Sequence, residues 1–105
     1  MRWLETIKVQ AASGKESRVE NELMALVRDV RKSPECPGLL DAVVYRLASF
    51  SGYFAIRLFW DTECPQIRGS VVGLSFAESL KAFGLVDHSV WIEVTKIQRG
   101  KENGQ

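Results

Sequence analysis

Two titratable side chains stand at positions where the hydrophobic pattern points into the protein, and they are the first candidates for acid–base chemistry. Glu5 alternates in phase with Trp3 and Ile7, so we expect it on the buried side of a strand. A carboxylate desolvated beneath the helices would be a candidate general base. His88, the only histidine, alternates in phase with Val90 and is a second candidate proton carrier. The alternatives are that Glu5 lies near the strand end or pairs with an arginine, and that His88 is a surface or cap histidine.

Three aromatic side chains are candidates for binding a ligand: Tyr45, Trp60 and Phe76. We expect the first two on the inner face of the sheet, where each offers an apolar ring and a polar tip. Gly73 and Ala77, on the helix that carries Phe76, would leave space above them for a small aromatic molecule. Plain core packing, with this helix lying closer to the sheet, is the alternative.

Two further placements bear on these candidates. His88 begins the last strand and Trp60 ends a strand of the same direction, so we expect them on the order of 20 Å apart, at about 3.3 Å per residue. Arg68, followed by Gly69 and Ser70 at a helix start, could hold an anion through free backbone N–H groups.

The two cysteines lie in repeated Glu-Cys-Pro segments, "SPECPG" at 33–38 and "TECPQ" at 62–66. Both segments fall at the same end of two paired strands, so Cys36 and Cys64 should be near neighbours. Two free thiols, a reversible disulfide and a metal site are all open, although zinc would need four ligands and we expect His88 at the other end. Proline after each cysteine also has a simpler cause, because each marks where a regular element begins or ends.

Six regular elements should position these residues. Alternating or β-rich runs predict strands at 3–10, 39–48, 53–60 and 85–97. Helical spacing predicts one helix between a Ser13 cap and Pro34, and a second between a Ser70 cap and a left-handed Gly84. The order predicts an α+β, ferredoxin-like βαββαβ sandwich with an antiparallel four-stranded sheet and both helices on one face. We expect a single domain over 1–98 and a flexible tail over 99–105.

The face of the sheet away from the helices is predicted to bind a second copy of the chain. We expect the hairpin to pair residues whose numbers sum to about 101 or 103, which sets Tyr45 on the inner face with Trp60. The opposite face is then too apolar for open water, and its charges can pair across a two-fold axis. We expect a homodimer through the face that bears Tyr53, Arg57, Phe59 and Trp91.

Several segments resemble the antibiotic biosynthesis monooxygenase family of dimeric α/β barrel proteins: "CPGLL", "FAIRLFW" ending on Trp60, a short second helix and "SVWIEV". The resemblance spans about residues 3–97. It implies a homodimer with a pocket between sheet and helices in each subunit. Some members of the family oxidise polycyclic aromatic substrates without a cofactor and others cleave haem. The haem-degrading members use an Asn, a Trp and a histidine of the second helix, and this chain matches only the Trp, at Trp60.

Composition excludes other classes of function. Fourteen Lys and Arg against thirteen Asp and Glu leave no broad positive field for nucleic acid or membrane lipid. RNA binding by a recognition motif of the same topology is disfavoured, because Ser51 and Ala55 stand where that motif has a basic and an aromatic residue. With no apolar run near the roughly 20 residues of a membrane span and no signal peptide, we expect a cytoplasmic protein. The sequence leaves two functions open: a cofactor-independent monooxygenase acting on a small aromatic or quinone-like compound, and a non-catalytic dimeric ligand-binding or interaction module.

Overall fold

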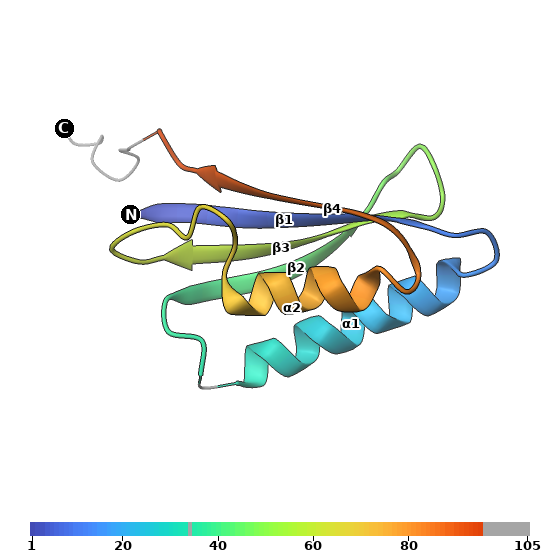
Figure 1. Ribbon diagram of the computed structural model, residues 1–105, viewed down its shortest axis with the longest axis horizontal. Helices are drawn as coiled ribbons and strands as arrows, with labels where there is room; N and C mark the ends of the chain where they lie inside the picture. The colour runs from blue at the N-terminus through green and yellow to red at the C-terminus, as the bar shows by residue number, and fades with distance from the viewer. Residues whose placement is uncertain (34, 96–105) are drawn as a thin grey trace.

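A computed structural model describes residues 1–33 and 35–95 and confirms the predicted order of elements. The elements are β1 (Arg2–Ala11), α1 (Glu16–Lys32), β2 (Leu39–Arg46), β3 (Tyr53–Asp61), α2 (Val71–Leu80) and β4 (Gly84–Ile92). The four strands form one antiparallel sheet in the order β2-β3-β1-β4. Both helices lie on one face of this sheet (Figure 1), as the ferredoxin-like fold requires.

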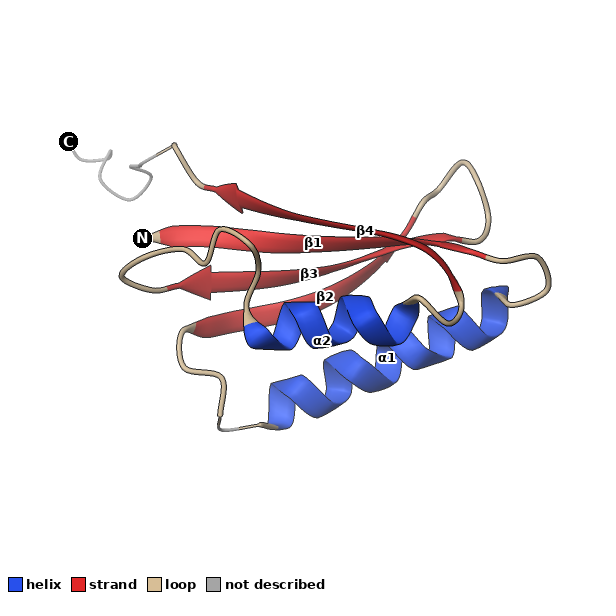
Figure 2. Cartoon of the chain, in the orientation of Figure 1, coloured by secondary structure: helices blue, strands red, loops and turns tan. Residues whose placement is uncertain are grey.

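The core lies between the sheet and the two helices (Figure 2). β1 is central, and its alternation puts Trp3, Ile7 and Val9 into the core while Lys8 and Gln10 stay exposed. α1 buries one stripe at helical spacing, formed by Val19, Leu23, Val27 and Val30. Neither helix covers the opposite face of the sheet in the described part of the chain (Figure 2), and this face is called the open face below. No helix among the described residues is long and apolar enough to cross a membrane.

The two helix starts differ from each other in how they are capped. Ser70 caps α2 as predicted, because its hydroxyl accepts a hydrogen bond from the backbone N–H of Gly73 at 2.9 Å. The Ser13 cap was wrong: α1 is preceded by Lys15 and has no side-chain cap. Gly84 was also assigned the wrong role, since it does not have a positive φ and instead begins β4. A Cβ there would collide with the backbone of Gln10, which explains the glycine.

The β2–β3 hairpin has a different register from the predicted one. Ala42 pairs with Leu58 and Val44 with Ile56, so the paired numbers sum to 100. An even sum reverses the face of every β2 residue relative to an odd one. Tyr45 therefore lies on the open face, and not on the inner face with Trp60. The six-residue loop 47–52 joins the two strands in this register, with Gly52 at φ 84° and the N–H of Leu47 donating to the carbonyl of Tyr53 at 2.9 Å.

Two predictions fall partly or wholly outside the described residues. The tail at 99–105 lies outside them, and so does the end of the strand predicted at 85–97. Within the described part, β4 ends at Ile92. The single-domain assignment over 1–98 remains a prediction.

Candidate functional site

Glu5 is completely buried, and its carboxylate is the centre of a polar cluster inside the core. Its Oε1 accepts hydrogen bonds from the indole N–H of Trp60 at 2.9 Å and the hydroxyl of Ser70 at 2.6 Å. Its Oε2 accepts the backbone N–H of Ser70 at 2.9 Å and lies 2.9 Å from Nε2 of His88. These four partners fill the roughly four acceptor positions of an ionised carboxylate. The cluster therefore joins β1, β3, β4 and the start of α2.

Two glycines make room for this carboxylate. A Cβ built on Gly73 would lie 2.7 Å from Cδ of Glu5, closer than real side chains approach. A Cβ on Gly69 would lie 3.1 Å from Oε2 of Glu5 and 3.0 Å from Nε2 of His88, and Gly69 has a φ of 110°, which strains other residues. The segment Gly69–Gly73 thus lets the N-terminus of α2 approach the carboxylate closely, where the helix dipole favours a negative charge.

His88 is the most exposed member of the cluster. Its side chain is 14% exposed, whereas that of Glu5 is 0% exposed. Beside an ionised carboxylate, Nε2 of His88 carries the hydrogen and donates it, which leaves Nδ1 as the acceptor nitrogen. Among the described residues, Nδ1 has no hydrogen-bond partner.

The predicted separation of His88 and Trp60 was wrong, because both contact the same carboxylate. His88 pairs with Ile7 and Trp60 with Trp3, so their backbones are four residues apart along β1. Glu5 stands between these two positions. Side chains that lean along the strands close the remaining gap.

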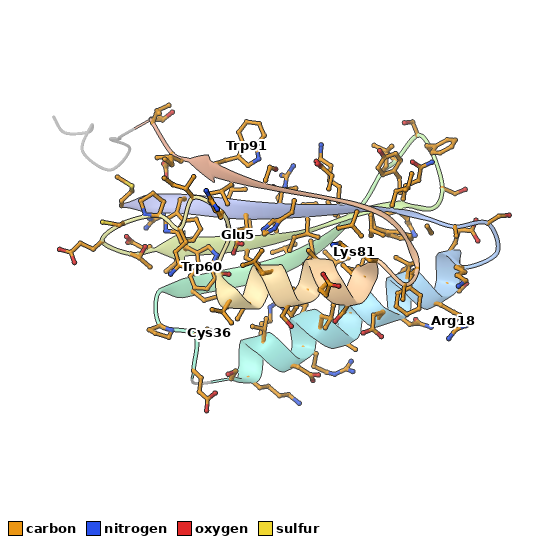
Figure 3. The ribbon with its side chains drawn as sticks, viewed as in Figure 1. Glu5, Arg18, Cys36, Trp60, Lys81 and Trp91 are labelled. Atoms are coloured by element: carbon orange, nitrogen blue, oxygen red, sulfur yellow. The ribbon has the colours of Figure 1, made fainter. Side chains whose placement is uncertain are left out.

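Trp60 also forms an aromatic stack with Trp3. Their ring centroids are 5.4 Å apart with an interplanar angle of 12°, and both rings are buried. The indole N–H of Trp3 donates to Oγ1 of Thr62 at 2.8 Å. Figure 3 shows Glu5 and Trp60 on the helix side of the sheet, while Trp91 projects from the open face. Both indole N–H groups therefore have hydrogen-bond acceptors inside the chain, and that of Trp60 is the carboxylate of Glu5.

The space predicted beneath α2 is occupied by the protein itself. Gly73 meets the carboxylate of Glu5, and Phe76 and Ala77 are buried in the core. Two of the hollows among the described residues lie on or beside the open face. One, of about 470 Å³, is bordered by Trp3, Trp60 and Trp91 together with Phe59. The other, of about 490 Å³, lies at the hairpin end of this face and includes Tyr45.

The structure brings together Glu5, Trp60 and His88, and it separates Tyr45 from them. Sequence reasoning missed Ser70, Gly69 and Gly73 as contacts of the carboxylate, although it identified Gly69 and Ser70 as a possible anion site. Here the helix start binds the chain's own Glu5 as its anion. The signal was the spacing Gly-Ser-x-x-Gly at a helix start, which needed a buried acidic residue elsewhere in the chain to complete it.

The cysteine segments leave the same end of the β2–β3 hairpin, where the N–H of Asp61 donates to the carbonyl of Gly38 at 2.8 Å. Cys36 is half-buried against the core and Cys64 is exposed, and both are free thiols. In residues 1–33 and 35–95, no three His, Cys, Asp or Glu side chains gather as a metal site would require. Thiol titration with and without reductant tests the reversible disulfide, because two thiols under both conditions would rule it out.

Comparison with known proteins links the chain to others by structure alone. No family model and no curated protein sequence matches it. Rv0793 from Mycobacterium tuberculosis has a TM-score of 0.68 at 13% identity, over 93% of this chain and 100% of its own. A Deinococcus radiodurans protein named after the antibiotic biosynthesis monooxygenases has a TM-score of 0.64 at 14% identity, over 92% and 97%. SnoaB, a cofactor-independent oxygenase from Streptomyces nogalater, has a TM-score of 0.59 at 12% identity, over 93% and 98%.

These neighbours include the group that the sequence resembles, and they cover nearly the whole chain. At such low identity the likeness establishes the fold. Activity depends on the side chains of a site, because one fold carries many functions.

Proposed function

We propose that this protein is a cofactor-independent monooxygenase that acts on a small hydroxylated aromatic compound, with His88 as the proton acceptor. The observation that carries the proposal is the pair of Glu5 and His88. Glu5 is buried and already bound by four groups, whereas His88 is partly exposed and has Nδ1 free of described partners. A carboxylate behind an imidazole fixes its tautomer and stabilises the imidazolium formed when Nδ1 takes a proton. In this proposal His88, and not Glu5, is the base. Glu5 is the residue that positions the imidazole of His88.

The proposed reaction begins with transfer of a phenolic proton from the substrate to Nδ1 of His88. The resulting phenolate is electron-rich and reduces dioxygen directly. Overall, a phenol and O₂ give a quinone and water: the ring gains one oxygen atom and loses two hydrogens, and the second oxygen atom leaves in water. SnoaB, which shares the fold, is described as a cofactor-independent oxygenase, and this supports the same class of chemistry here.

Oxygen uptake with a panel of hydroxylated naphthalenes and anthracenes tests the proposal. General-base catalysis contributes about 100-fold or more, so His88→Gln should lower kcat by about that factor with little change in KM. Glu63→Gln, at an exposed loop carboxylate, is the matched control and should keep full activity. Wild-type protein that consumes no oxygen with any compound, or a fully active His88→Gln variant, would contradict the proposal.

A non-catalytic ligand-binding or interaction module is the second candidate, and one observation favours it. The carboxylate of Glu5 fills the space at Gly73 and ties α2 to the sheet, which is a structural role. Tryptophan fluorescence titrated with the same aromatic panel separates the two functions. Quenching without oxygen uptake supports the module, whereas quenching with oxygen uptake supports the enzyme.

We also propose that the protein forms a homodimer through its open face. Trp91 is 60% exposed there and Leu85 74% exposed, and the half-buried Phe59 lies near Trp91, since both pair with Leu4 of β1. A second copy covering this face would remove on the order of 800 Å² per subunit from water, the size of a stable interface.

Phe59→Asp should dissociate the dimer at micromolar concentration in sedimentation, because it buries an unpaired charge. Met24→Asp, on the helix side, should not. A wild-type monomer at that concentration would refute the dimer.

A further inference from the structure

We propose that the hollow at the hairpin end of the open face, here called the basic hollow, binds a small planar aromatic anion. It has a volume of about 490 Å³ and is bordered by Lys8, Tyr45, Arg46, Tyr53, Ala55 and Arg57. A volume of this size falls in the range of small-molecule sites, about 300–1,000 Å³. The site is distinct from the cluster around Glu5, which lies on the other face of the sheet.

The charge around the basic hollow is positive and is not neutralised within the described chain. Lys8, Arg46 and Arg57 all border it, and none forms an ion pair with a described residue. Among residues 1–33 and 35–95, no carboxylate borders the hollow. Asp87 stands opposite Lys8 in β4, yet the two form no ion pair. Lys8 and Arg57 lie on the open face, whereas Arg46 pairs with the buried Phe54 and has the parity of the helix side. An anion placed in the hollow would therefore meet the cations of Lys8 and Arg57, which have no ion-pair partner among the described residues.

The aromatic residues of the basic hollow favour a planar ligand over a simple inorganic anion. The guanidinium of Arg57 lies 5.0 Å from the ring centroid of Tyr45, so cation and ring already form a stacked pair. Tyr53 presents a second ring, in contact with Phe50 at 6.3 Å between centroids. A flat aromatic ring can extend this stack, while its acidic group takes a bidentate hydrogen bond from the guanidinium fork. The recognised chemistry is therefore an aromatic carboxylate, sulfonate or phenolate.

This ligand would also lower the cost of the proposed dimer. A second copy on the open face removes water from Lys8 and Arg57, and desolvated charges without partners are destabilising. An anion bound between them offsets that cost, so ligand and partner should strengthen each other's binding. This coupling rests on the proposed dimer, whereas binding of the anion by the hollow does not.

Calorimetric titration with naphthalene-2-sulfonate as the probe tests the proposal. The sulfonate should bind at least about 10-fold more tightly than neutral 2-naphthol, since only the sulfonate meets the cations. Arg57→Gln and Lys8→Gln should each weaken sulfonate binding by about 5-fold or more, and 500 mM salt should weaken it further. Arg28→Gln, an exposed arginine of α1 away from the hollow, should bind like wild type. Circular dichroism of each variant shows whether it has folded.

Three results would overturn the proposal: equal affinity for sulfonate and naphthol, wild-type affinity in both Arg57→Gln and Lys8→Gln, or displacement of the sulfonate by a short single-stranded RNA that binds more tightly. His88→Gln separates this site from the proposed reaction. It should retain sulfonate binding even if it loses oxygen uptake. Loss of oxygen uptake with intact binding therefore tests the enzyme alone, and loss of binding in Arg57→Gln tests the basic hollow alone.

Discussion

The two faces of the sheet differ in whether their polar side chains have partners within the chain. On the helix-covered face, the carboxylate of Glu5 is fully buried and every one of its acceptor positions has a partner from the chain. On the open face, Arg57 and Lys8 have no ion-pair partner among the described residues, and Trp91 lies largely in water. The polar groups of the Glu5 cluster are paired within the chain, whereas charged and aromatic side chains of the open face are exposed and without ion-pair partners among the described residues.

This difference separates residues that hold the fold from exposed residues that would contact the proposed partner or ligand. Removing one group from a satisfied buried network leaves the others desolvated and unpaired, and the cost appears as lost stability. Removing a group from an exposed face leaves its neighbours in water, and the cost appears only in binding. His88 lies at the boundary, because it bonds to the buried network and still reaches solvent.

The largest effect should come from removing the carboxylate at the centre of the covered face. Glu5→Leu leaves the N–H groups of Trp60 and Ser70 buried without acceptors, and each such group costs about 1–3 kcal/mol, so the free energy of unfolding should fall by about 3–5 kcal/mol. Glu5→Gln keeps one acceptor oxygen but turns an N–H toward one of the donors, and should lose about 1–3 kcal/mol. Urea unfolding measures both.

Glu63→Gln is the control for this pair, because its carboxylate is exposed and makes no contact with the cluster. It should unfold like wild type. If Glu5→Leu proves as stable as wild type, the four hydrogen bonds contribute nothing net, and the contrast between the two faces is lost.

A smaller effect, with a diagnostic sign, is expected at Gly73. Helix propensity alone predicts that Gly73→Ala stabilises α2 by about 1 kcal/mol. The structure predicts the opposite, a loss of about 1–3 kcal/mol, since the new Cβ would collide with the carboxylate of Glu5. Ser75→Ala, exposed on the same helix, is the control and should be neutral or slightly stabilising. Stabilisation by Gly73→Ala in thermal unfolding would mean that the carboxylate can move aside.

The fold could be predicted from the sequence because its signals are local. Alternation in β1, the apolar stripe of α1 and the Ser70 cap each depend on neighbouring residues, and these determine the order of the elements. The same alternation predicted that the side chain of Glu5 points into the core. It could not predict the hydrogen-bond partners of Glu5, because they come from three other elements and meet only when the tertiary structure forms.

The register of the β2–β3 hairpin could not be read from its loop. The pattern of β2 is apolar on both sides, with Ala42 and Val44 alternating against Val43 and Tyr45, so hydrophobicity does not choose a face. A shift of one residue then exchanges the two sides. Packing decides the choice, because small Ala42 and Val44 fit beneath the helices while Tyr45 stacks with Arg57.

The smallest expected effect lies on the open face and tests this register directly. Tyr45 is 42% exposed, so Tyr45→Ala should lose no more than about 1 kcal/mol, the size of an exposed cation–π pair with Arg57. Phe54→Ala, at a 4% exposed ring of the neighbouring strand, should lose about 3–5 kcal/mol because it leaves a cavity. Unfolding of both variants at one protein concentration gives the comparison. Equal losses would place Tyr45 in the core after all, and the basic hollow would then lack its aromatic wall.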